Sequence, residues 1–263
     1  MDEQLSRRRL LASAAAIGTV GLAGCLGTRE GEVPAPVVTN PRIDDGWRLV
    51  EEMSETVFSQ DVGPVTVEAH ARSVVYEYAS VADALAEALD ASGSPVLFFT
   101  VRIDLRPAVD GLPFGLGRTQ LMEEIEPAAA EAFRQLLRDG GIENVQTVAT
   151  SEIDIDAGHQ ATEFLFTGNF PVTGTMDLGA GLTGSIADEF EIESRLAIWH
   201  DGTDLLLAGG AYPTRPMDAV FENAIGDAPV ALAELVGESH STTLAQDPET
   251  YAAEIELLLR SVV

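Results

Sequence analysis

The chain has 263 residues, with 43 Asp and Glu against 15 basic residues that are all Arg, and its formal charge is −28. Hydrophobic residues make up 46% of the chain, which suffices for a packed core and excludes a disordered acidic chain. The charge also argues against nucleic acids and anionic lipid headgroups as partners, because both require a basic face.

The N-terminus has the features of an export signal. A basic run, Arg7–Arg9, precedes residues 10–23, which are uncharged and too few to span a bilayer as a helix, since spanning takes about 20 residues. Residues 6–11 (SRRRLL) resemble the twin-arginine export pattern, in which paired Arg, here Arg7 and Arg8, are read by a receptor. We therefore expect export through this route.

The end of the signal resembles a lipobox. Residues 22–25 read LAGC, and in proteins with a lipobox cleavage falls before the Cys and its sulfur takes a lipid. Cys25 is the only Cys of the chain, so an intrachain disulfide is impossible and no other thiol is left for catalysis. We expect residues 1–24 to be a signal peptide and Cys25 to anchor the protein to the membrane. The alternative is a buried Ala-rich helix with a chance Cys.

A tether and one domain are expected after the anchor. Residues 26–43 hold three Pro and two Gly with little apolar periodicity, so residues 25–44 are predicted to be the lipid anchor and a flexible tether. Residues 45–263 are predicted to be a single domain, because no repeat and no clear internal linker interrupts them.

The acidic surface points to a saline environment. Removing residues 1–24 takes away two acidic residues and three Arg, so the mature chain would carry −29. Such a charge repels itself in dilute buffer, whereas in molar salt the Debye length falls to about 3 Å and the repulsion is screened. Acid excess with Arg in place of Lys resembles proteins of salt-loving archaea. The alternative is an acidic patch for a cationic ligand or Ca²⁺.

The first half of the domain alternates strands and helices. The predicted elements are a hairpin over 47–78 with its turn at 61–64, a helix over 81–89 with Ser80 as its N-cap and Gly93 as its stop, a strand over 95–106, and a helix over 119–139 that kinks or restarts at Pro127 and ends at Gly140-Gly141.

The second half is first β and then helical. The predicted elements are strands 144–156 and 160–172, a loop over 173–187, a hairpin of 189–200 with 204–212 that turns at Asp201-Gly202, and helices over 219–225, 230–236 and 248–262, the last capped by Asp247. This order predicts an α+β fold: a mainly antiparallel sheet with helices packed on one face, followed by C-terminal helices.

Two pairs of residues are candidates for ligand binding. Arg102 and Arg106 share one face of a predicted strand with Asp104 and could clamp an anion; the alternative is a salt-bridged row. Trp199 and Tyr212, near the ends of one hairpin, could stack on a ligand; the alternative is core or rim packing.

Other patterns favour structural interpretations. Residues 179–184 match G-x-G-x-x-G, but a strand-like segment follows where a dinucleotide site needs a helix. The acidic triplets, Glu152/Asp154/Asp156 and Glu189/Glu191/Glu193, lack a calcium-loop spacing and are interpreted as solvated faces. No His forms a zinc motif, so neither a metal nor a cofactor is expected.

Several stretches together resemble an uncharacterised family of haloarchaeal lipoproteins. They are the twin-Arg signal with LAGC, SVVYEYA (73–79), FFTVRIDLRP (98–107) and IWHDGTDLLLAGGAYP (198–213), and the resemblance covers most of residues 45–213. Because that family is a domain of unknown function, the resemblance implies a location and a one-domain organisation but no activity.

The main hypothesis is a non-enzymatic, lipid-anchored domain outside the cell membrane that binds a small solute or an envelope protein. One alternative is a hydrolase with a dispersed site around His200, Asp201, Ser239 and His240, although no G-x-S-x-G elbow is present. The other is a structural or assembly lipoprotein that only contacts other envelope proteins.

Overall fold

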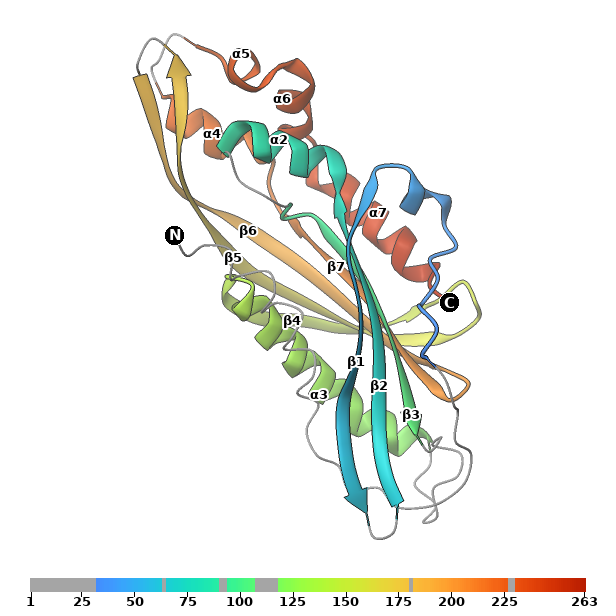
Figure 1. Ribbon diagram of the computed structural model, residues 1–263. Coiled ribbons are helices and arrows are strands. Elements are labelled where there is room, and N and C mark those ends of the chain that lie inside the picture. The colour runs from blue at the N-terminus through green and yellow to red at the C-terminus, as the bar shows by residue number, and fades with distance from the viewer. Residues whose placement is uncertain (1–31, 63–64, 90–93, 107–117, 180–181, 227–229) are drawn as a thin grey trace.

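The computed structural model describes residues 32–62, 65–89, 94–106, 118–179, 182–226 and 230–263 (Figure 1). In chain order the elements are η2 (Pro41–Asp44), β1 (Trp47–Val62), β2 (Val65–Tyr78), α2 (Ala79–Leu89), β3 (Leu97–Arg106), α3 (Arg118–Asp139), β4 (Glu143–Asp154), β5 (Gln160–Gly179), β6 (Leu182–Asp201), β7 (Asp204–Pro213), α4 (Asp218–Ile225), α5 (Leu232–Val236), α6 (Glu238–Leu244) and α7 (Pro248–Arg260).

All seven strands belong to one antiparallel sheet, in the order β1-β2-β3-β7-β6-β5-β4. Strand β7 lies at the centre and joins the β1–β3 half to the β4–β6 half. Its burial is complete, since all ten of its residues are buried. The α+β class, the antiparallel sheet and the C-terminal helices are therefore confirmed.

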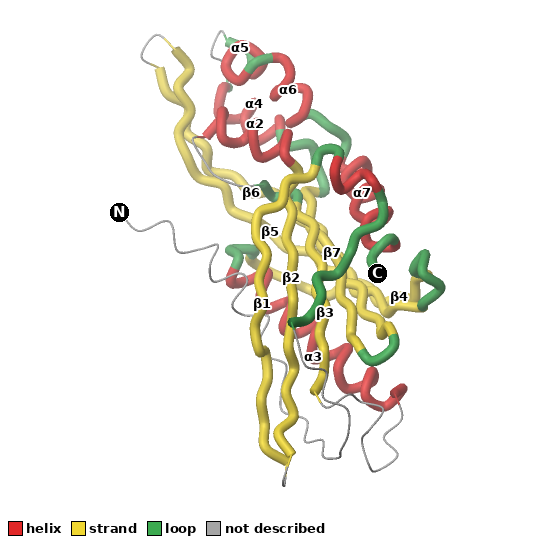
Figure 2. Tube along the Cα trace, turned by 45° about the vertical axis from the view of Figure 1, so that its right-hand side comes forward, coloured by secondary structure: helices red, strands yellow, loops and turns green. Residues whose placement is uncertain are grey.

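Helices cover both faces of the sheet. Ala197 and Trp199 of β6 belong to the larger apolar cluster with α2, α4 and α7, whereas Leu196 and Ile198 belong to a smaller cluster with α3. Figures 1 and 2 show α3 on one side of the sheet and the other helices on the opposite side. The predicted single helical face thus needs a correction for α3. Its apolar stripe, which includes Phe133, covers side chains that would otherwise face water.

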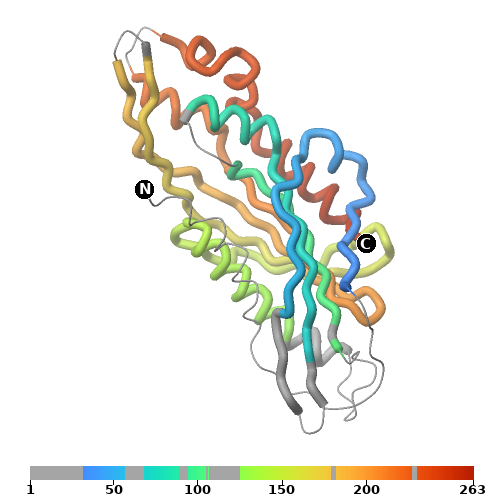
Figure 3. The backbone as a smooth tube through the Cα atoms, viewed as in Figure 1, coloured from blue at the N-terminus to red at the C-terminus, as the bar shows by residue number. Residues whose placement is uncertain are grey.

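The predicted loop over residues 173–187 is wrong. β5 continues to Gly179 and β6 begins at Leu182, so the two strands form a long hairpin arm that Figure 3 shows at one end of the molecule. Met176 and Ile186 are buried in the larger cluster, and α4 packs on this part of β6. The apolar alternation of a strand is present, but the segment is rich in Gly, which is depleted in strands and therefore favoured the loop.

The two edge strands are less regular than the central strands. β1 and β4 each show two register shifts against their neighbour, and Val50 and Val148 lie at two of them. The pairings of β3 with β2 and β7, and of β6 with β7, show none. Such bulges interrupt the ladder of free backbone groups and thereby disfavour pairing with another edge.

Residues 32–44, which we call the strap, lie against the domain. Val33 and Pro36 are buried, and Ile43 belongs to the larger cluster. The backbones of Val37 and Val263 exchange two hydrogen bonds, of 2.8 and 2.9 Å. The prediction of a flexible tether is thus wrong for this part of residues 25–44, because its apolar side chains and backbone groups find partners on the domain.

The charged end of the strap holds two elements together. Arg42 pairs with Glu254 of α7, and the same carboxylate accepts a hydrogen bond of 3.2 Å from Trp47 Nε1. Glu254 is 7% exposed, so its charge depends on these partners. One buried carboxylate thus connects the strap, β1 and α7.

Most local signals give the expected element ends. Asp247 caps α7 by accepting from the backbone of Glu249, and Gly202 adopts φ +59° in the β6–β7 turn. Ser80 is not an N-cap, because α2 begins one residue earlier, and α3 continues through Pro127 as one helix. Helix α6 was not predicted. Gly93 and part of the 61–64 turn lie outside the described residues.

A methyl group added at Gly210 should destabilise the domain. A Cβ there would lie 2.6 Å from the carbonyl oxygen of Leu97 and 2.9 Å from the side chain of Ile255. We expect Gly210→Ala to lower the free energy of unfolding by about 1–3 kcal/mol, measured by chemical denaturation in molar salt. The control Ala187→Val, at an exposed position of β6, should change it by less than about 0.5 kcal/mol. Equal effects would contradict the packing argument.

Candidate functional site

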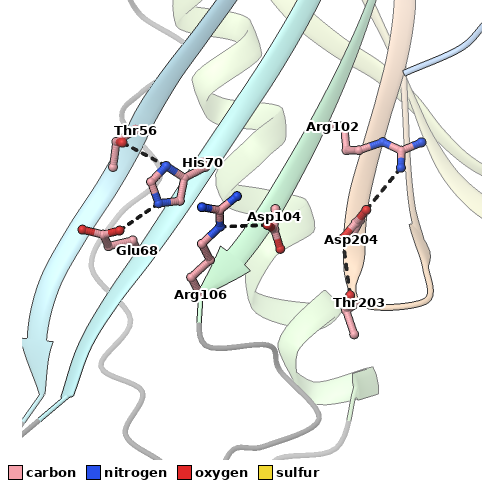
Figure 4. Close-up of polar contacts among 8 residues, drawn as sticks. All are labelled: Thr56, Glu68, His70, Arg102, Asp104, Arg106, Thr203 and Asp204. Carbon is pink, nitrogen blue, oxygen red and sulfur yellow. Dashed lines mark hydrogen bonds and ion pairs between the residues drawn. The ribbon is translucent and has the colours of Figure 1, made fainter. Parts of the chain in front are cut away.

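Polar residues line one face of the central strands. Thr100, Arg102, Asp104 and Arg106 alternate along β3 and share the face of Phe98, while Asp204 of β7 lies directly opposite Asp104. We call these five residues the polar row; Figure 4 shows its four charged members. Central strands that are otherwise apolar thus carry charged side chains at the end of the sheet far from α2 and α6.

Each Arg of the polar row is paired with an Asp. Arg102 Nη1 donates to Asp204 Oδ2 at 3.3 Å, and Arg106 Nε donates to Asp104 Oδ2 at 2.9 Å. Asp104 and Asp204 are 2% and 5% exposed. The strand register places two buried carboxylates opposite each other, where their charges would repel. The two Arg residues offset this repulsion.

This pairing changes the interpretation of Arg102 and Arg106. The structure places both on one face, as predicted, and also brings in Asp204, which the sequence pattern did not identify. The four charges sum to zero, and a simple anion would have to displace a buried carboxylate. The geometry therefore corresponds to the salt-bridged row and gives little support to a plain anion clamp.

The polar row continues onto β2 and β1. In register, Glu68, His70 and Arg72 lie opposite Arg106, Asp104 and Arg102. His70 Nε2 is 2.8 Å from Glu68 Oε2, and His70 Nδ1 is 3.0 Å from Thr56 Oγ1, as Figure 4 shows. Arg72 pairs with Glu52 and with Glu32 of the strap. Polar and charged residues thus extend from β7 across β3 and β2 to β1, with Arg72 and Arg102 directly opposite each other.

Trp199 lies on the same face as the polar row. It pairs in register with Leu206, which in turn pairs with Arg102, so Trp199 and Arg102 are two strands apart. Its side chain is 1% exposed, and its Nε1 has no hydrogen-bond partner among the residues that the structure describes. Trp199 is therefore a core residue with an unsatisfied donor and not an exposed stacking surface.

Tyr212 is also buried, at 5% exposure, and its hydroxyl donates to Glu193. Burial, followed by the hydrogen bond to Glu193, raises the pKa of Tyr212. The side chain thus contributes core packing with a satisfied hydroxyl, which is the alternative that the sequence left open for it.

Arg195 centres a network that sequence reasoning missed. It lies within 3.5 Å of both Glu163 and Glu193 and 3.7 Å from Glu256 of α7. Burial lowers the pKa of Arg195, but the neighbouring Tyr212 and carboxylates outweigh this effect and raise it. The only signal in the sequence was a lone Arg in a strand of acidic and apolar residues.

The residues of the hydrolase alternative do not meet. His240 belongs to α6, which packs against α2 and α5, and its Nδ1 is 3.0 Å from the carbonyl oxygen of Val236. His200 and Asp201 end β6 at the β6–β7 turn, and Figures 1 and 2 show this turn at the opposite end of the sheet from α6. Asp201 lies 3.5 Å from His159. Ser239 and His240 therefore cannot form a triad with them.

The remaining motifs keep their structural interpretation. The acidic triplets at 152–156 and 189–193 are largely exposed, and no group of His, Cys, Asp and Glu in the described part of the chain is arranged to hold a metal ion. The G-x-G-x-x-G motif lies at the β5–β6 connection, with β6 in place of the helix that a dinucleotide site requires. Arg7, Arg8 and Cys25 lie outside the described residues.

Comparison with known proteins identifies a family. Residues 34–263 match the Domain of unknown function (DUF6517), so the chain belongs to this family. The match includes most of the strap, in agreement with its docking on the domain. No curated protein and no solved structure matched the chain.

The four Tyr residues should titrate abnormally. Burial raises the pKa of Tyr76, Tyr78, Tyr212 and Tyr251 above the usual value of about 10. Below pH 10 the phenols are protonated in both states and do not affect stability. Above it, the unfolded chain releases protons that the folded chain retains, so the free energy of unfolding should fall.

Phenolate absorbance in alkaline titrations of folded and denatured protein measures this difference. Its midpoint should lie near pH 10 in denaturant and at higher pH in the folded protein. Coincident curves would show that the phenols are not protected.

Proposed function

We propose that the chain is an exported, lipid-anchored envelope protein whose domain binds a small polar solute outside the cell membrane. The observation that carries the anchoring is the signal-like N-terminus, which ends in LAGC with the single Cys of the chain. None of the described helices is long and apolar enough to cross a membrane. A lipid on Cys25 is the attachment that we propose.

The docked strap supports a short distance to the membrane. Only residues 26–32 separate Cys25 from Val33, which is buried on the domain. An extended chain spans at most about 3.6 Å per residue, so the domain would lie within about 30 Å of the lipid. This is a close attachment, and the strap would limit how freely the domain turns on its anchor.

The polar row supports solute binding over the two alternatives. It includes two charged side chains, Arg102 and Asp104, that each keep one buried polar atom without a hydrogen-bond partner among the described residues, and Arg72, opposite Arg102, pairs with Glu32 of the strap. The hydrolase alternative lacks a common site for its residues. A purely structural envelope protein remains the outcome if no solute binds, and the irregular edge strands give it no obvious sheet-to-sheet interface.

The anchor is tested by Cys25→Ser. We expect this variant to move from the membrane fraction into the medium, because the serine hydroxyl cannot take the thioether-linked lipid. Fractionation of cells that express the full chain, followed by immunoblotting, measures the distribution. Cys25→Ala should behave in the same way, and full membrane retention of both variants would rule out this anchor.

The salt requirement is tested on the purified domain. At −29 the mature chain should lose structure as salt falls below molar concentration, since the Debye length grows from about 3 Å at 1 M to about 10 Å at 0.1 M. Circular dichroism and tryptophan fluorescence during dilution of KCl follow the loss. Sucrose at matched osmolality should not replace the salt, and stable folding in dilute buffer would contradict the adaptation.

A further inference from the structure

Four side chains on one face of the sheet each have a buried polar atom without a partner. They are Thr100 Oγ1, Arg102 Nε and Asp104 Oδ1 at successive inward positions of β3, and Trp199 Nε1 level with Arg102 on β6; none has a hydrogen-bond partner among the described residues. Thr100 is fully buried, and Asp104 and Trp199 are 2% and 1% exposed.

Such atoms are costly when they are left unsatisfied. A buried donor or acceptor without a partner costs about 1–3 kcal/mol, so folded proteins rarely keep several in one place without ordered water or a ligand. Two more unpaired donors, Arg195 Nε and Arg260 Nε, belong to the ion-pair network with α7. The four atoms around Arg102 are not part of that network.

The unsatisfied atoms define a chemistry. Arg102 Nε and Trp199 Nε1 offer hydrogens, Asp104 Oδ1 offers lone pairs, and the Thr100 hydroxyl can do either. The charged neighbours cancel, since Arg102 is paired with Asp204 and Arg106 with Asp104. A ligand of zero net charge with an acceptor and a donor close together fits this set better than an anion or a cation.

We propose that this part of the sheet binds a small zwitterion, a free α-amino acid, and we call Thr100, Arg102, Asp104 and Trp199 the zwitterion centre. The carboxylate of the ligand accepts from Arg102, Trp199 and the Thr100 hydroxyl, and its ammonium group donates to Asp104. This inference rests on the proposed solute-binding function and names the class of solute.

The strap runs close to the centre. At one end Glu32 pairs with Arg72, which lies opposite Arg102 on β2, and further along Val37 and Thr39 bond to the C-terminal residues after α7. Figure 2 shows this segment crossing the face of β3.

The test is isothermal titration calorimetry on the full chain in molar KCl. The probes are the standard amino acids one by one, then acetate, ethylammonium and sulfate. We expect at least one amino acid to bind and the half-molecules acetate and ethylammonium to bind at least about tenfold more weakly. Sulfate or acetate binding as tightly as the best amino acid would overturn the zwitterion in favour of an anion.

Thr100→Val separates a binding centre from a structural one. Valine has nearly the same shape but lacks the unsatisfied hydroxyl, so the free protein should melt at an equal or higher temperature while amino-acid affinity falls about fivefold to tenfold. Thr175→Val, at an exposed position of β5, is the matched control and should leave affinity unchanged. A lower melting temperature of Thr100→Val with no amino acid bound by the unmodified protein would mean that ordered water fills the centre.

A negative result here is distinguishable from failure of the anchoring proposal. If no amino acid binds but Cys25→Ser still leaves the membrane, the zwitterion centre is wrong and the lipid anchor stands. If an amino acid binds and Cys25→Ser stays on the membrane, the zwitterion centre stands and the lipid anchor is wrong. A crystal structure with the bound amino acid should place its carboxylate on Arg102 Nε and Trp199 Nε1.

Discussion

The fold depends on how closely the backbone of β7 can be approached. A Cβ at Gly209 would lie 2.0 Å from the carbonyl oxygen of Arg195, and one at Gly210 would meet Leu97 and Ile255. These two residues allow β6, β3 and α7 to meet on the central strand. Because β7 joins the two halves of the sheet, the same close contacts hold both halves and the C-terminal helix together.

The position of α7 in turn sets the position of the strap. Ile255, Leu258 and Leu259 are fully buried, so the C-terminus of the helix is fixed over the sheet. Ser261 and Val263 then offer backbone groups that the strap uses, and Glu254 receives Arg42 and Trp47. A segment whose sequence predicts a Pro-rich linker thus becomes part of the domain, because α7 and the residues after it offer hydrogen-bond partners to it.

Local signals predicted the elements well and the long-range arrangement poorly. Asp247-Pro248 and Asp201-Gly202 act through neighbouring backbone, so the α7 cap and the β6–β7 turn could be recognised directly. The strap, the side of the sheet that α3 covers and the pairing of Arg102 with Asp204 depend on residues far apart in the chain. No local sequence pattern indicates these long-range contacts.

The candidate residues show the same limit. Strand alternation predicted that Arg102 and Arg106 share a face with Asp104, and a salt-bridged row was the alternative to an anion clamp. The sequence did not identify Asp204, which pairs with Arg102. Trp199, near the end of a predicted hairpin, was a candidate for stacking on a ligand, with core or rim packing as the alternative. Trp199 is buried in the larger apolar cluster with residues of α2, α4 and α7, which only the tertiary structure brings together.

The proposed saline environment explains why recognition would be buried. At molar salt exposed charges more than about 3 Å apart hardly interact, so an acidic surface cannot select a charged solute. Charges removed from solvent are screened much less, and the Arg–Asp pairs of the polar row are among the most buried of the described charges. A protein with 43 acidic residues would therefore discriminate between solutes with its few buried charges and not with its exposed ones.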